Sequence, residues 1–176
     1  MGTEHTIYPE IEGWMYDGDL LYLRETARRL GGPILEIGSF CGLSTAVLSE
    51  DGREVWCVDT FRGGEDLPER DTLAEFVGNM IRLDRKNVRV VRFSSRDFFR
   101  RFNVPRLFSM IFIDGSHKTE AVLSDLVGAL ITVKPGGVII LDDLYWGEGR
   151  PVLAALKQAG LPFREIPKTK MAEVSC

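Results

Sequence analysis

The sequence predicts an α/β fold with a Rossmann-like, doubly wound and mostly parallel sheet of seven strands. Three observations support this fold class. Short, continuous apolar runs alternate with segments of helical periodicity along most of the 176 residues. Runs of this kind are typical of parallel strands that helices cover on both faces. Acidic residues also stand at the ends of several runs, and such sheets bind ligands at the carboxyl ends of their strands.

The expected elements follow one another in a regular order. A polar and aromatic arm, 1–18, precedes a helix that begins with Asp19 as its N-cap and stops at Gly31-Gly32. Strands are then expected at 33–38, 54–59, 87–93, 107–113 and 138–141. Helices are expected at 43–50, 69–83, 95–102, 118–132 and 149–159, with a loop at 60–71. A closing hairpin, 161–166 and 170–174, adds an antiparallel strand pair.

The chain is predicted to form one domain, 31–176, preceded by an N-terminal arm and helix, 1–30. A chain of 176 residues can bury a sizeable core as a single domain. Trp14, Met15 and Tyr16 are unusually apolar for a terminal tail. The arm therefore either packs on the core or forms a lid that walls a substrate pocket.

Composition argues against several classes of protein. The net charge of -4 makes nucleic acid an improbable main partner, although the basic segment 82–106 is either a solvated face or a patch for an acidic substrate. Three cysteines without metal-ligand spacing imply no disulfide framework. The chain has no apolar run of membrane-spanning length and no signal-peptide pattern. We expect a cytoplasmic protein without a membrane partner.

The turn after the first strand is the first candidate site. Gly38 and Gly42 bracket this turn, and Ser44 lies where the next helix begins. In doubly wound folds the backbone approaches a nucleotide-like ligand at this position. Phe40 stands where a dinucleotide-binding turn has its middle glycine, and this favours a ligand without phosphate, such as a sulfonium nucleoside. Asp59, at the end of the second strand, is placed to bind a ribose.

A second candidate site follows the fourth and fifth strands. Asp114, Asp142 and Asp143 come from neighbouring strand ends, so their carboxylates can converge on a hard divalent cation such as Mg²⁺. His117 follows Asp114 by three residues, and an imidazole is a side chain that suits a general base. The structural alternative is that such acids, and His117, cap the helices that follow.

Three segments resemble class I S-adenosylmethionine-dependent methyltransferases. Residues 35–45, Leu-Glu-Ile-Gly-Ser-Phe-Cys-Gly-Leu-Ser-Thr, are similar to the first motif of that family in the form found in catechol O-methyltransferase and its metal-dependent relatives. Residues 112–117 and 134–143 are more similar to the macrolide-sugar O-methyltransferases and the cephalosporin-hydroxylase-like proteins. The resemblance extends over about 30–175.

The resemblance implies S-adenosylmethionine as the cofactor and a divalent cation, Mg²⁺, as a second one. It implies that Asp114, Asp142 and Asp143 ligate the cation, and that Asp114 and His117 are catalytic, with His117 as the base. The residues implied to bind S-adenosylmethionine are Glu36, Gly38, Ser39, Phe40, Gly42, Ser44, Asp59, Thr60, Phe61, Ser95, Arg96 and Asp114.

The expected reaction transfers the sulfonium methyl group to a hydroxyl of a small molecule, such as a sugar, a catechol-like compound or a natural product. The cation would lower the pKa of that hydroxyl, and His117 would take its proton. Two alternatives stay open: a cation-independent methyltransferase acting on another atom, and a non-catalytic cofactor-binding or interaction module. Because only about 30 residues precede the first strand, a homo-oligomer whose second subunit completes the acceptor pocket also stays open.

Overall fold

A computed structural model of the chain describes residues 5–63, 70–144 and 149–176. Its sheet has seven strands in the order β3-β2-β1-β4-β5-β7-β6. The strands are β1 (Ile34–Ile37), β2 (Val55–Val58), β3 (Val88–Val91), β4 (Phe108–Ile113), β5 (Val133–Leu141), β6 (Phe163–Glu165) and β7 (Ala172–Ser175). The helices are α1 (Asp17–Leu30), α2 (Leu43–Leu48), α3 (Leu73–Arg82), α4 (Ser95–Arg101), α5 (Thr119–Thr132) and α6 (Arg150–Gln158).

Strand directions confirm the predicted fold class. The five strands β1 to β5 pair in parallel, whereas β7 runs antiparallel to both β5 and β6. The register aligns Ile37 with Ile113, and Ile113 with Leu141. Residues that follow these three strands therefore emerge side by side at one edge of the sheet.

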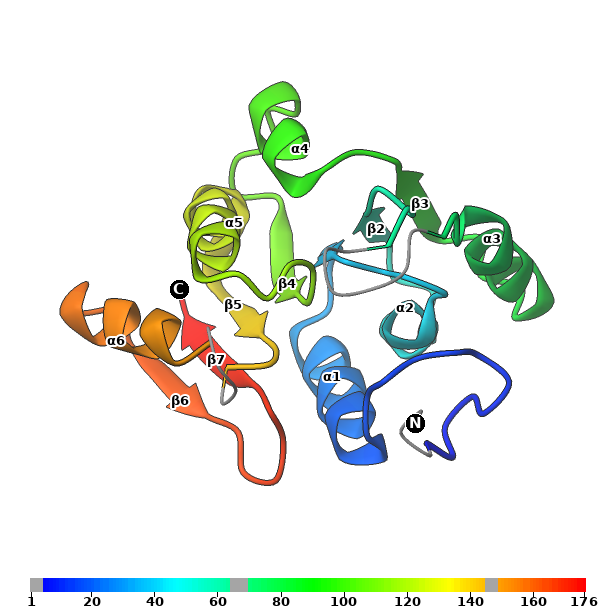
Figure 1. Cartoon of the computed structure of the whole chain (residues 1–176), viewed down its shortest axis with the longest axis horizontal. Coiled ribbons are helices and arrows are strands. Elements are labelled where there is room, and N and C mark those ends of the chain that lie inside the picture. Colours follow the sequence, from blue (N-terminus) through cyan, green and yellow to red (C-terminus); the bar gives the residue numbers. More distant parts are fainter. Residues whose placement is uncertain (1–4, 64–69, 145–148) are drawn as a thin grey trace.

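Helices cover both faces of the sheet, as Figure 1 shows, with α1 to α3 on one face and α4 to α6 on the other. Successive side chains of a strand point to opposite faces. In β1, Ile34 belongs to the core under α1 and α2, whereas Leu35 and Ile37 belong to the core under α5 and α6. The continuous apolar runs are thus explained by burial on both faces.

Two details of the predicted elements are wrong. Asp19 is not the N-cap of α1, because the helix begins at Asp17 after Tyr16, and the Asp19 carboxylate accepts a hydrogen bond from the Tyr16 backbone N–H at 3.1 Å. The strand β5 begins at Val133 rather than at 138, since Val133 already pairs with Phe108 before a register shift. Of the expected loop at 60–71, residues 64–69 lie outside the described part of the chain.

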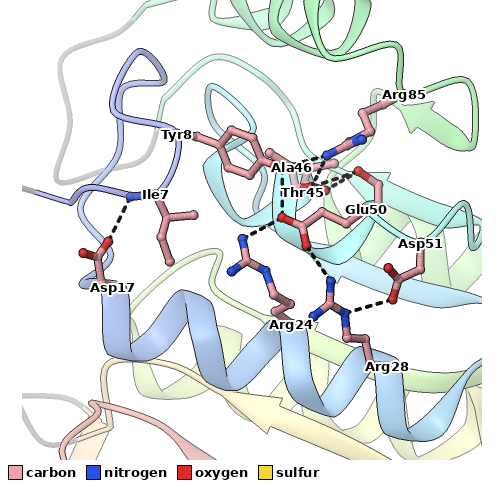
Figure 2. Close-up of polar contacts among 11 residues, drawn as sticks. Ile7, Tyr8, Asp17, Arg24, Arg28, Thr45, Ala46, Glu50, Asp51 and Arg85 are labelled. Carbon is pink, nitrogen blue, oxygen red and sulfur yellow. Dashed lines mark hydrogen bonds and ion pairs between the residues drawn. The ribbon is translucent and has the colours of Figure 1, made fainter.

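The described part of the N-terminal arm packs against α1 and α2. Ile11 and Met15 are buried in the core. Figure 2 shows Glu50, after α2, between the arm and α1: it accepts a hydrogen bond from the Tyr8 hydroxyl at 2.9 Å and pairs with Arg24 at 2.6 Å. Within the residues described, no helix is long and apolar enough to cross a membrane.

Candidate functional site

A cavity of about 940 Å³ opens at the carboxyl edge of the sheet. Its walls come from the segments that follow β1, β2, β3, β4 and β5, with residues 12–15 of the arm and Lys170 of the β6–β7 turn. Backbone hydrogen bonds continue the strand pairing by one residue into this edge, from Asp114 to Ile37 and from Asp142 to Ile113. The two predicted sites therefore share one cavity.

The glycine turn after β1 is shaped by close backbone packing. Gly38 has a φ of 86°, and a Cβ added there would lie 2.8 Å from Gly115 Cα and closer still to the Asp114 carbonyl oxygen. Gly42 has a φ of 93° and faces Met80 and Phe76 of α3. The two glycines let the turn lie against the segment after β4, while Gly38, Ser39, Phe40 and Ser44 line the cavity. Gly42 does not line it.

Glu36 stabilises this turn from the side that faces away from the cavity. It is fully buried and does not line the cavity, and its carboxylate accepts hydrogen bonds from the hydroxyls of Ser39, at 2.7 Å, and Thr45. Burial raises the pKa of Glu36, and the neighbouring hydroxyls oppose this rise. The structure thus ties Glu36 to the geometry of the turn and places it behind the cavity wall.

Asp59 lines the cavity and also holds the turn. One carboxylate oxygen accepts hydrogen bonds from the backbone N–H groups of Ser39 and Phe40, at 2.7 and 2.9 Å, and the other accepts one from Phe61 N–H at 2.7 Å. The alternative that Asp59 caps the next helix is wrong, because Thr72 is the N-cap of α3. Likewise, the N-cap of α5 is Lys118 and that of α6 is Gly149, not an acid at a strand end or His117.

The other predicted cofactor residues divide between the cavity and its surroundings. Thr60, Ser95 and Asp114 line the cavity. The Phe61 side chain is buried against Phe76, with ring centroids 5.1 Å apart, and lies outside the lining. Arg96 is exposed and also outside it.

Acidic side chains gather at the β4–β5 end of the cavity. Ligand atoms of Asp114, His117 and Asp143 all lie within 4.8 Å of one another, the His117 Nε2 being 3.3 Å from an Asp143 oxygen. Asp142 lines the cavity but lies outside this group, and one of its oxygens accepts the Asp143 backbone N–H at 2.8 Å. Burial, together with the neighbouring carboxylates, raises the pKa of Asp114. The two carboxylates suit a divalent cation, and the imidazole beside them suits a general base.

Lys170 is part of this group, and the sequence contained no signal for it. Its Nζ lies 2.5 Å from an Asp143 oxygen, in a turn that follows β5 by almost thirty residues. Burial by itself would lower the pKa of Lys170, but Asp142 and Asp143 outweigh it and raise that pKa. The ammonium group therefore supplies a positive charge next to the carboxylates.

Asp125 is a second functional candidate that sequence reasoning missed. It lines the cavity from α5, together with Ala121 one turn earlier, and only 4% of it is exposed. A signal was present, because Asp125 interrupts the apolar stripe of α5 that contains Val122 and Ala129. A polar residue on a buried helix face is the informative exception to hydrophobic burial.

A family described as a methyltransferase domain matches residues 35–144, which is more than half of the chain. The chain belongs to this methyltransferase family. The resemblance to class I methyltransferases is thereby confirmed at the level of the family. No curated protein matches this methyltransferase domain in sequence.

Solved structures share the fold of this methyltransferase domain. Cofactor-bound Rv0187 from MTB is 17% identical with a TM-score of 0.74, and the match covers 90% of this chain and 79% of that one. A Staphylococcus aureus protein described as a caffeoyl-CoA O-methyltransferase is 18% identical with a TM-score of 0.72, over 94% and 85% of the two chains. CalS11, a calicheamicin methyltransferase, is 16% identical with a TM-score of 0.71, over 90% and 78%.

Proposed function

We propose that this methyltransferase domain transfers the methyl group of S-adenosylmethionine to a hydroxyl of a small molecule, with a divalent cation at the acceptor. The observation that carries the proposal is the convergence of Asp114, His117 and Asp143 in the cavity that the glycine turn also lines. The family match supports methyl transfer. The neighbours described as caffeoyl-CoA O-methyltransferase and calicheamicin methyltransferase make a small-molecule acceptor a reasonable choice.

The cofactor would occupy the part of the cavity between the glycine turn and the ends of β2 and β3. The volume of about 940 Å³ leaves room for an acceptor beside it. Phe40 has a φ of 46° and presents its backbone, already hydrogen-bonded to Asp59, where a dinucleotide site brings a glycine to a pyrophosphate. A sulfonium nucleoside does not require that close approach.

The acceptor would lie at the β4–β5 end. Asp114 and Asp143 would hold the cation, with Asp142, in the same cavity, as the third predicted ligand. A divalent cation, when bound, lowers the pKa of a hydroxyl that contacts it. His117 is oriented by its 3.3 Å contact with Asp143, and its half-exposed ring can accept the hydroxyl proton and release it to solvent.

The N-terminal arm would cover the cavity beside the glycine turn as a lid. Residues 12–15 line the cavity, and Trp14 packs on Phe40 with ring centroids 4.7 Å apart. Arg70 reaches Glu12 at 2.9 Å, so the arm is tied to the segment that precedes α3. These contacts hold residues 12–15 in place as one wall of the cavity. Binding of the acceptor would rearrange that wall.

The experiment combines ligand binding with metal removal. S-adenosylmethionine or S-adenosylhomocysteine, at 100 times its dissociation constant, should stabilise the protein by about 2.7 kcal/mol, whereas NAD should not. Methyl transfer to catechol and sugar acceptors should require Mg²⁺, stop with EDTA, and fall at least about 100-fold in Asp143→Asn. The matched control is Asp84→Asn, an exposed acid outside the cavity. Absence of any stabilisation by either cofactor form would refute the proposal, and transfer that survives EDTA and Asp143→Asn would refute the cation.

A cation-independent methyltransferase is the second candidate, and Lys170 is the observation that favours it. Its ammonium group already lies 2.5 Å from an Asp143 oxygen, where it can neutralise the carboxylates without a metal. Lys170→Met separates the two candidates. If a cation is used, the variant should bind Mn²⁺ more tightly because a competing charge is gone. If it is not used, the variant should lose transfer, and EDTA should leave transfer by the wild type unchanged.

A further inference from the structure

Asp125 lies near the β3 end of the cavity. The group of Asp114, His117 and Asp143 lies at the opposite, β4–β5 end. The lining there comes from Phe93, Ser94 and Ser95, at the β3–α4 junction, and from Ala121 and Asp125 of α5. The Ser95 side chain lies beside the Asp125 carboxylate and acts to lower its pKa. Two elements that are separated by β4 in the sequence thus join at this end of the cavity.

The Asp125 carboxylate has unused capacity to accept hydrogen bonds. An ionised carboxylate offers about four acceptor positions, and the Ser95 hydroxyl can fill at most one or two of them. No ion pair to Asp125 occurs among the residues that the structure describes. Burial raises the pKa of Asp125 to about 6, with only the Ser95 side chain opposing the rise. A buried acceptor of this kind is best satisfied by an N–H donor that a ligand brings into the cavity.

The topology indicates which part of the cofactor reaches Asp125. The strands follow the order β3-β2-β1-β4 across the sheet. A cofactor whose reacting sulfonium lies near Asp114, after β4, and whose ribose lies near Asp59, after β2, carries its base towards β3 and the start of α4. Ser95 and Asp125 meet at that place.

We propose that Asp125 is a specificity-determining residue that accepts a hydrogen bond from the exocyclic amino group of the cofactor's adenine. This inference rests on the proposed function. A base with a keto oxygen in place of the amino group would place a hydrogen-bond acceptor against the Asp125 carboxylate, which is also an acceptor. Sites built to bind an N–H group reject analogues that lack it, because the buried polar group is then left unpaired.

The test compares two ligands in each of several proteins by calorimetry. The ligands are S-adenosylhomocysteine and S-inosylhomocysteine, its deaminated analogue with a keto oxygen. We expect the wild type to prefer the adenine form at least about 10-fold. Asp125→Asn should reduce this ratio to near one or invert it, because the amide can donate to the keto oxygen. Glu120→Gln, an exposed acid on the same helix outside the cavity, should keep the wild-type ratio.

The ratio is measured within one protein, so partial unfolding of a variant does not change it. Asp125→Ala serves if the asparagine variant does not fold, and it should also lose the preference for adenine. An Asp125 variant that keeps the wild-type ratio overturns the inference while leaving the proposed function intact. A wild type that binds neither ligand overturns both.

Discussion

Replacing Gly38 by alanine should disrupt the contact on which the cofactor side of the cavity depends. The added Cβ would lie 2.8 Å from Gly115 Cα, about 1 Å inside the ordinary carbon–carbon contact of about 3.5–4.0 Å. Overpacking of this kind costs about 1–3 kcal/mol. The positive φ of 86° adds about 1–2 kcal/mol for any residue with a Cβ. We therefore expect a loss of about 2–5 kcal/mol in the free energy of unfolding, measured by urea denaturation.

Gly52→Ala is the matched control for this prediction. Gly52 also has a positive φ, 74°, but a Cβ there would meet nothing within 4 Å. The control should therefore lose only the conformational part, about 1–2 kcal/mol. Because Gly38→Ala also separates the turn from the Asp114 segment, S-adenosylhomocysteine should bind it at least about 10-fold more weakly by calorimetry. Equal destabilisation of the two variants would refute the steric reasoning.

Three other predictions concern the arm, the thiols and the pH dependence of stability. Tyr8→Phe removes a hydroxyl that donates to Glu50 and accepts from Arg85, so urea denaturation should show a loss of about 1 kcal/mol. A thiol reagent should label the exposed Cys176 and spare Cys41 and Cys57, which are buried, until the protein unfolds; mass spectrometry after proteolysis checks this. The raised pKa of Asp125, from 3.8 to about 6, corresponds to about 3 kcal/mol of stability that is present below about pH 4 and lost as the pH rises through about 6. The stability of Asp125→Asn relative to wild type should therefore increase by about that amount between pH 4 and 7, and a constant difference would contradict the burial of the charge.

Much of the fold could be predicted because burial leaves a local pattern. Apolar runs of strand length between amphipathic helices are typical of a sheet that is covered on both faces, so the order of elements and the parallel core could be predicted. Element ends were less readable. An acid in the first helical turn is favourable at several positions, so the sequence could not distinguish Asp19 as an N-cap from Asp19 at the third helical position.

The candidate site was predictable to the extent that it depends on strand ends. Asp59, Asp114 and Asp142 follow parallel strands, and all three line the cavity. The side-chain directions were not predictable. Phe61 follows Asp59 closely in the sequence, yet its positive φ of 56° turns the backbone and its ring lies in the core.

The sequence by itself determined the class of fold, the glycine turn and the edge of the sheet where the acids collect, because these depend on local periodicity and strand order. The tertiary structure decided which charges meet there. Lys170 reaches Asp143 from a hairpin turn, and Asp125 reaches Ser95 from another helix. Contacts between elements far apart in the chain depend on how those elements pack, and the sequence of one segment does not show which residue of the other segment it meets.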